Sequence, residues 1–184
     1  MNGPVARNVG EDFSPPAGRP LAPERVQPVY PQRKRNRLPA EIYRQGGAFF
    51  LTTTVRNRRR AFSSAAVASR CLSILRDVAA KSGVEIDTYC LMPDHLHLLA
   101  TAEENVDIVA FVHRFKQAAA IECNREIGWQ GAFWQASYYD HVLREIEDVG
   151  PIRDYILGNP VRARIVEDSD DYPFAAFLAP EPQE

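Results

Sequence analysis

The alternation of strand-like and helix-like segments constrains the fold of this chain more than any other feature. Four segments are rich in β-branched and aromatic residues or alternate apolar with polar residues, which predicts strands at 48–55, 84–90, 95–101 and 134–143. Three other segments have the apolar spacing or the charge pattern of helices: 63–83, 105–127 and 145–157. The predicted order along the chain is therefore β-α-β-β-α-β-α.

Local signals set the expected boundaries of the helices. Ser63 or Ser64 offers an N-cap for the first helix, Gly83 closes it, and Asn105 offers an N-cap for the second. The third helix has acidic residues in its first turn, where the helix dipole favours negative charge. We expect Pro160 to stop this helix, because the residue before a proline resists helical geometry.

The second and third strands are separated only by the short turn Met92-Pro93-Asp94, which predicts a β-hairpin. A hairpin at the centre of a β-α-β-β-α-β order is typical of the ferredoxin-like split β-α-β arrangement. We therefore predict an α+β fold with an antiparallel sheet and one added C-terminal helix.

A length of 184 residues, with 45% hydrophobic and 25% charged residues, fits one globular domain. Residues 1–36 contain many prolines and few large apolar residues, so we predict a disordered tail, which ends in a basic cluster at 33–37. We assign 37–178 to the folded domain and expect 179–184 to be frayed.

Cysteine content and hydropathy indicate the environment of the chain. Cys71, Cys90 and Cys123 are odd in number and show no metal-binding spacing, so we expect reduced core residues. No apolar run approaches the roughly 20 residues of a membrane span, and the N-terminus has no signal-peptide pattern. We expect a cytoplasmic protein without a membrane partner.

The segment His95-Leu96-His97 is the strongest candidate for chemistry. Residues two apart on a strand point to the same face, so both imidazoles project together. Two adjacent imidazoles suit a divalent cation, which can polarise a phosphodiester oxygen. The alternative is a pair of half-exposed histidines at a sheet surface. A histidine-triad nucleotide hydrolase would need a third histidine where this chain has Leu99.

Tyr155 and Asn159 lie four residues apart near the end of the third predicted helix, and so share one helical face. A tyrosine can attack a phosphodiester, and an amide oxygen can complete a metal site. The alternatives are a packing tyrosine and a capping asparagine. Tyr139, which is followed by Asp140 and His141, is a competing nucleophile.

Taken together, four motifs resemble the single-tyrosine HUH transposases, in which two histidines flank a bulky hydrophobic residue. Within this family the chain is most similar to the REP-associated tyrosine transposases, over about residues 37–177. The motifs that carry the resemblance are the segments 49–54 and 91–99, Trp134 with 139–142, and 154–156 with 159–161.

The resemblance implies a ferredoxin-like fold and a site in which His95, His97 and Asn159 bind Mg²⁺ or Mn²⁺. Some relatives have glutamine at the position of Asn159. The resemblance also implies that Tyr155 cleaves and rejoins single-stranded DNA through a 5′-phosphotyrosine intermediate. The implied substrates are hairpin-forming repeated extragenic palindromes or transposon ends. The family contains monomers and homodimers, and we expect a monomer here.

Basic and aromatic residues are the candidates for DNA contact, although the net charge of the chain is −2. Cations that neutralise phosphates give salt-dependent affinity, and aromatic rings stack on unpaired bases. The basic candidates are Arg56, Arg58, Arg59, Arg60, Arg114 and Lys116. The aromatic candidates are Trp129, Trp134 and Tyr138. Two alternative functions stay open: a catalytically silent relative that binds hairpin DNA, and a histidine-motif phosphohydrolase.

Overall fold

In the computed structural model, the structure describes residues 41–143 and 149–178. Within them a five-stranded sheet has the order β4-β1-β3-β2-β5, and all neighbouring strands are antiparallel. The strands are β1 (Gly47–Thr54), β2 (Val84–Met92), β3 (His95–Ala102), β4 (Tyr139–Leu143) and β5 (Ala175–Phe177). The first four strands have the β4-β1-β3-β2 order of a ferredoxin-like sheet, which confirms the predicted fold class.

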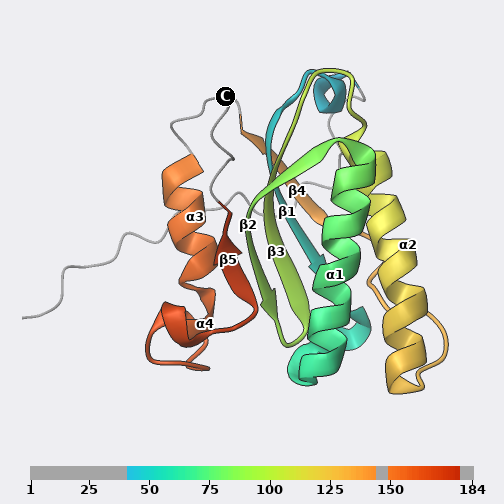
Figure 1. The fold of residues 1–184 in the computed structure, drawn as a ribbon, viewed down its shortest axis with the longest axis vertical. Coiled ribbons are helices and arrows are strands. Elements are labelled where there is room, and N and C mark those ends of the chain that lie inside the picture. Colours follow the sequence, from blue (N-terminus) through green and yellow to red (C-terminus); the bar gives the residue numbers. More distant parts are fainter. Residues whose placement is uncertain (1–40, 144–148, 179–184) are drawn as a thin grey trace, which may run out of the picture. The chain divides into compact units, whose positions relative to one another are not determined.

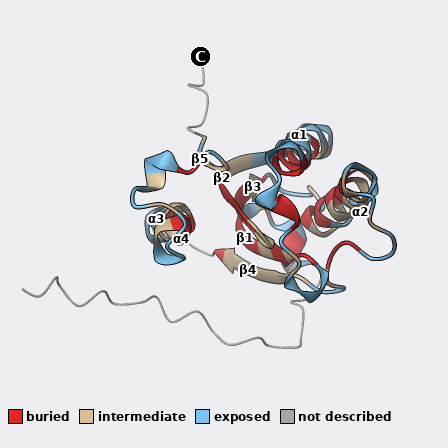
Figure 2. Cartoon of the chain, turned by 90° about the horizontal axis from the view of Figure 1, so that it is seen from below, coloured by how far each residue is buried: buried red, intermediate tan, exposed pale blue. Residues whose placement is uncertain are grey.

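Helices cover both faces of this sheet (Figure 1). The long helices α1 (Ala65–Ser82) and α2 (Ile108–Ile127) lie on one face, and α3 (Val149–Leu157) and the short α4 (Asn159–Arg162) lie on the other (Figure 2). Short 3-10 helices occur at Ile42–Arg44, Arg56–Arg58, Ala61–Ser63 and Ser169–Asp171. None of the helices in the described ranges is long and apolar enough to cross a membrane.

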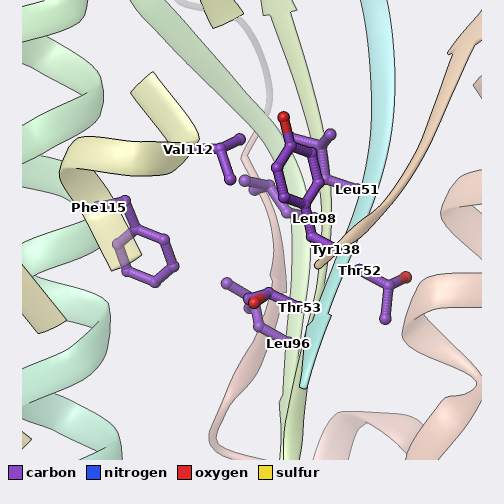
Figure 3. A pocket seen from close by; sticks show the side chains of 8 residues that line it. All are labelled: Leu51, Thr52, Thr53, Leu96, Leu98, Val112, Phe115 and Tyr138. Carbon is purple, nitrogen blue, oxygen red and sulfur yellow. The ribbon is translucent and has the colours of Figure 1, made fainter. Parts of the chain in front are cut away.

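The main hydrophobic core lies between the sheet and the long helices, because strand residues alternate between the two faces. Leu51, Leu96 and Leu98 face α2, where Val112 and Phe115 are buried against them. Figure 3 shows Thr52 pointing to the opposite side of the sheet from these residues. The cavity drawn there, about 10 Å³, has room for at most one water molecule, so it is a packing gap and not a ligand site.

A second, smaller apolar layer lies under α3. Phe50 and Leu99, which pair with each other across β1 and β3, are buried on this face of the sheet. Ile152 and Ile156, one helical turn apart on α3, are buried against it. This packing places the tyrosine-bearing helix over the histidine-bearing face.

Several predicted boundaries were wrong, each for a local reason. The second helix begins at Ile108, where the Asp107 side chain accepts a hydrogen bond from the Ala110 amide at 2.9 Å; Asn105 has a φ of 69° and is no cap. The predicted strand 134–143 is a strand only from Tyr139, because Trp134 makes a single bridge to Val55.

The region around Pro160 also differs from the prediction. The third helix ends at Leu157 as expected, but Pro160 lies in the first turn of the short helix α4, which begins at Asn159, since a proline in a first turn needs no amide hydrogen. Strand β5 was not predicted. The start of the predicted third helix, the predicted tail (1–36) and the frayed end lie outside the described residues. All three cysteines are buried and free, as expected.

Candidate active site

The two histidines begin the central strand β3 and point to the face that α3 covers. Their Nε2 atoms are 3.1 Å apart, and their rings are perpendicular with centroids 4.7 Å apart. His97 is only 7% exposed, while His95 is partly exposed. The strand geometry predicted this shared face, and the structure confirms it.

Oxygen atoms from the neighbouring residues orient both imidazole rings. The Asp94 carboxylate accepts a hydrogen bond from His95 Nδ1 at 2.6 Å, and Thr52 Oγ1 lies 2.9 Å from His97 Nδ1. Burial alone would raise the pKa of Asp94, but the hydrogen bond and charge of His95 and the charge of Arg58 lower it, so the carboxylate stays ionised. With Nδ1 engaged on each ring, the two Nε2 atoms face each other at hydrogen-bonding distance, 3.1 Å, and are the ring atoms left to bind a cation.

The protonation state of His97 suits a metal ligand. Burial, followed by the charges of His95 and Arg162, lowers the pKa of His97 to about 3. The imidazole is therefore neutral at physiological pH, which is the form that binds a cation.

The spacing of the two nitrogens also fits a cation. Adjacent ligands on an octahedral ion, each about 2.1 Å from it, are about 3.0 Å apart, close to the observed 3.1 Å. In the part of the chain that the structure describes, no group of three His, Cys, Asp or Glu side chains could hold a metal. Further ligands would have to be amide, water or phosphate oxygens, which a hard divalent ion accepts.

Tyr155 lies beside this pair. Its ring centroid is 5.7 Å from that of His97 and 6.0 Å from that of Phe50, both edge-on, and the residue is partly exposed. An ion pair also holds α3 against the sheet: Arg153 Nε donates to Asp87 Oδ1 at 2.7 Å, and Arg153 Nη2 to Oδ2. The phenol is thus neither buried in the interior nor remote from the histidines.

Asn159 lies one turn beyond Tyr155, at the start of α4. Its amide nitrogen donates to the carbonyl oxygens of Tyr155 and Ile156, at 3.0 and 3.2 Å. These bonds leave the amide oxygen as the atom that can accept a cation.

Tyr139, the competing nucleophile, lies in the same row of the sheet, since it pairs with Thr52, which pairs with His97. Burial, followed by the charges of Asp140 and Tyr155, raises the pKa of Tyr139. Its hydroxyl is buried and makes no hydrogen bond among the described residues. Tyr139 therefore loses its hydroxyl proton less readily than a tyrosine with an ordinary pKa.

Most of the predicted basic residues lie near the end of β1 that is closest to His95. Arg58 pairs with Asp94 at 3.3 Å, Arg59 stacks on Trp129 at 3.6 Å, and Arg60 contacts Ser63. Arg56 and Trp134 line an open cavity of about 450 Å³ with Asn57, Ala132, Gln135 and Ala136. This cavity lies at the end of β1 and one strand away from His95, because Gln135 bonds Thr54, which pairs with His95 across β1 and β3.

The other predicted contacts are distributed differently. Lys116 donates to the Gln135 carbonyl at 2.8 Å, close to the same cavity. Arg114 bonds Ser82 at 3.5 Å, at the opposite end of the sheet from His95 and on its other face. Trp134 is a core residue, only 6% exposed and packed against Phe133.

Sequence reasoning missed four residues that shape this site: Thr52, Asp87, Asp94 and Arg162. Asp94 directly precedes His95, so its role could have been suspected from the sequence. Thr52 and Asp87 could not, because their roles depend on strand register and on how α3 packs. Arg162 lies over the Tyr155 ring, with Cζ 4.4 Å from the ring centroid.

Comparisons with known proteins identify relatives of this chain. An Escherichia coli REP-associated tyrosine transposase is 29% identical over 136 residues, which cover 73% of this chain and 79% of the relative. A Haemophilus influenzae protein that provisionally carries the same name is 27% identical over 145 residues, covering 73% and 82%. A solved REP-associated tyrosine transposase bound to a REP hairpin is 25% identical, with a TM-score of 0.65, covering 78% of this chain and 81% of that one.

The family described as Transposase IS200 like matches residues 48–159, a region that includes β1 except its first residue, strands β2 to β4, the histidine pair and Tyr155. The match covers more than half of the 184 residues. The chain therefore belongs to the IS200-like transposase family and is an enzyme of the DNA-strand transferase class.

Proposed function

We propose that this chain is a metal-dependent transposase that cleaves and rejoins single-stranded, hairpin-forming DNA through a phosphotyrosine at Tyr155. The observation that carries the proposal is the Tyr155 ring beside His97, whose Nε2 converges with that of His95. The proposed nucleophile thus lies beside the proposed cation-binding pair.

The proposed ligands of Mg²⁺ or Mn²⁺ are His95, His97 and the amide oxygen of Asn159. A bound divalent ion supplies Lewis-acid polarisation of the scissile phosphate. Asp94 and Thr52 keep the two Nε2 lone pairs available by engaging the Nδ1 atoms.

The reaction is a pair of displacements at phosphorus. The Tyr155 hydroxyl loses its proton as its oxygen bonds to phosphorus, and the bond to the 3′ oxygen breaks. The 3′ oxygen takes up a proton, which leaves a 5′-phosphotyrosine and a free 3′-hydroxyl. A second 3′-hydroxyl then attacks the phosphotyrosine and releases the phenol. The number of phosphodiester bonds is conserved, so no external energy source is needed.

The proposed substrate is a repeated extragenic palindrome or a transposon end in single-stranded form. The solved relative bound to a REP hairpin supports this choice. The cavity lined by Arg56, Asn57 and Gln135 lies at the end of β1, one strand away from His95, and offers an unpaired strand a path toward the site. Arg58, Arg59, Arg60 and Lys116 lie around this path, and Arg114 lies away from it.

A monomer is the proposed active form, because the histidines and Tyr155 of a single chain already meet.

The test is a labelled single-stranded hairpin incubated with the protein and Mg²⁺. We expect a protein–DNA adduct that survives denaturation, requires the metal, and is lost in Tyr155→Phe but retained in Tyr139→Phe. Binding without an adduct would support a silent relative, and nucleotide turnover without DNA binding would support a phosphohydrolase. An adduct that disappears only in Tyr139→Phe would show that the nucleophile is misassigned.

A further inference from the structure

Arg162, the last residue of α4, folds its side chain back over the end of α3. The fold makes room for it at Gly158: a Cβ atom there would lie 2.6 Å from Arg162 Nη1 and 3.0 Å from the Asp154 carbonyl oxygen. Any larger residue at 158 would displace the guanidinium. Gly158 therefore lets the arginine reach the tyrosine.

The guanidinium is anchored on Tyr155 itself. Its Cζ lies 4.4 Å from the centre of the Tyr155 ring, and Nη2 donates a hydrogen bond to the Tyr155 carbonyl oxygen. A cation over an aromatic face is attracted by the ring, so the ring holds the guanidinium near the nucleophile.

The same charge also reaches the histidine face of the sheet. The Tyr155 ring that the guanidinium covers has its centroid 5.7 Å from that of His97. Arg162 also opposes the burial that raises the pKa of Cys90 to about 12. Cys90 pairs with His97 across β2 and β3. The guanidinium therefore acts on the point where the phenol and the histidines meet.

Most of the hydrogen-bonding capacity of Arg162 is unused. The residue is exposed and, among the described residues, donates only to the Tyr155 carbonyl and forms no ion pair. A guanidinium has five N–H donors in a planar fork that matches two oxygens of a phosphate. Because the guanidinium lies over the Tyr155 ring, a phosphate attacked by the phenol oxygen would come within reach of the side chain's free donors.

We propose that Arg162 is a further catalytic residue, which binds a non-bridging oxygen of the scissile phosphate and stabilises the charge that develops there when Tyr155 attacks. This inference rests on the proposed function and adds a protein cation to its site. Donors that are fixed before the reaction stabilise the transition state without reorganising.

The test uses two hairpin substrates, one with a natural scissile phosphate and one with a methylphosphonate, in which a neutral methyl group replaces one non-bridging oxygen. On natural DNA, we expect Arg162→Ala to slow adduct formation by about 100-fold, as loss of a charge-stabilising donor does. On one methylphosphonate stereoisomer, the variant and the wild type should react within about threefold of each other, because there is less charge to stabilise.

Two controls separate this role from a structural one. Arg70→Ala on α1 removes the same charge from an exposed residue that pairs with Glu122, and it should leave the rate unchanged. Arg162→Lys keeps the charge without the fork and should recover part of the rate on natural DNA. Urea unfolding compares the stability of all variants with that of the wild type.

An equal loss in Arg162→Ala on natural DNA and on both methylphosphonate stereoisomers would overturn the inference, because the arginine would then act through the position of Tyr155. An unchanged rate on natural DNA would also overturn it. Both results leave the proposed function intact. If the wild type forms no adduct with natural DNA, the proposed function and this inference fail together.

Discussion

The ion pair between Asp87 and Arg153 is expected to determine how firmly the tyrosine helix is attached to the sheet. Asp87 lies on β2 at a register irregularity, and its side chain is 10% exposed, while that of Arg153 is 33% exposed. Two parallel hydrogen bonds join them, and the carboxylate raises the pKa of Arg153. Arg153 also lies over the Phe177 ring, with Cζ 4.6 Å from its centre.

The coupling energy between Asp87 and Arg153 can be estimated from how far the two side chains are exposed. Fully exposed pairs contribute about 0.2–1 kcal/mol, and removing one partner of a buried pair costs about 3–5 kcal/mol. With one partner nearly buried and the other a third exposed, we expect a coupling energy of about 1–2 kcal/mol. Arg153→Met keeps the apolar stem and removes the charge, and it should cost about 2 kcal/mol of unfolding free energy, because Asp87 loses its ion-pair partner and keeps only the hydrogen bond from Thr88 Oγ1 at 2.6 Å.

The assay is a double-mutant cycle by urea unfolding with Asp87→Asn, Arg153→Met and the double variant. Hydrogen exchange locates the effect: amides of α3 should exchange roughly tenfold faster per 1.4 kcal/mol lost, while amides of α1 stay protected. A coupling energy below about 0.5 kcal/mol, or equal loss of protection in α1 and α3, would refute the view that this pair holds the tyrosine helix.

Three other predictions test separate parts of the molecule. Thr52→Val removes the hydroxyl beside His97 Nδ1 and should weaken Mn²⁺ binding by about tenfold in calorimetry, with the fold unchanged; unchanged affinity would mean that Thr52 does not orient the ring. Burial, followed by the charge of Cys90, raises the pKa of Tyr172 to about 12, and the unfolded value is about 10. Between these two pKa values the folded state binds more protons than the unfolded state, so the free energy of unfolding present below pH 10 should fall by up to about 3 kcal/mol as the pH rises to 12. In urea unfolding, Tyr172→Phe should lack this fall. The same pH dependence of the unfolding free energy in the variant and the wild type would contradict the prediction. Arg56→Ala should weaken single-stranded DNA binding and reduce its salt dependence by about one phosphate contact, whereas Arg114→Ala should not; equal effects in fluorescence anisotropy titrations would refute the proposed path.

The half of the site that lies within one strand could be predicted from the sequence. His95 and His97 share a face because strand residues alternate, and the Pro-Asp turn marks where the hairpin reverses. The strand order follows from the β-α-β-β-α-β pattern once the fold class is recognised. Local periodicity was sufficient for these features because each depends on neighbours in sequence.

The other half depends on contacts that sequence patterns do not contain. That Tyr155 lies beside His97 follows from the packing of Ile152 and Ile156 and from the pair formed by Arg153, none of which has a periodic signal on the sheet. Only the family resemblance placed the tyrosine there. Strand β5 was missed because three residues are too few to show alternation, and Pro160 was misjudged because the same residue can end one helix or begin another.

The two halves of the site are attached to the fold in different ways. The histidines belong to a strand that is hydrogen-bonded on both sides, so they cannot move without breaking the sheet. Tyr155 is held by side-chain contacts of one short helix, whose strength the Asp87–Arg153 pair adjusts. Loosening that pair should therefore slow adduct formation more than it weakens Mn²⁺ binding, because only Asn159 of the three proposed ligands is attached to the tyrosine helix. Thr52→Val should instead weaken Mn²⁺ binding more than it slows adduct formation. The two effects differ because paired strands hold both histidines rigidly, whereas side-chain contacts hold the nucleophile.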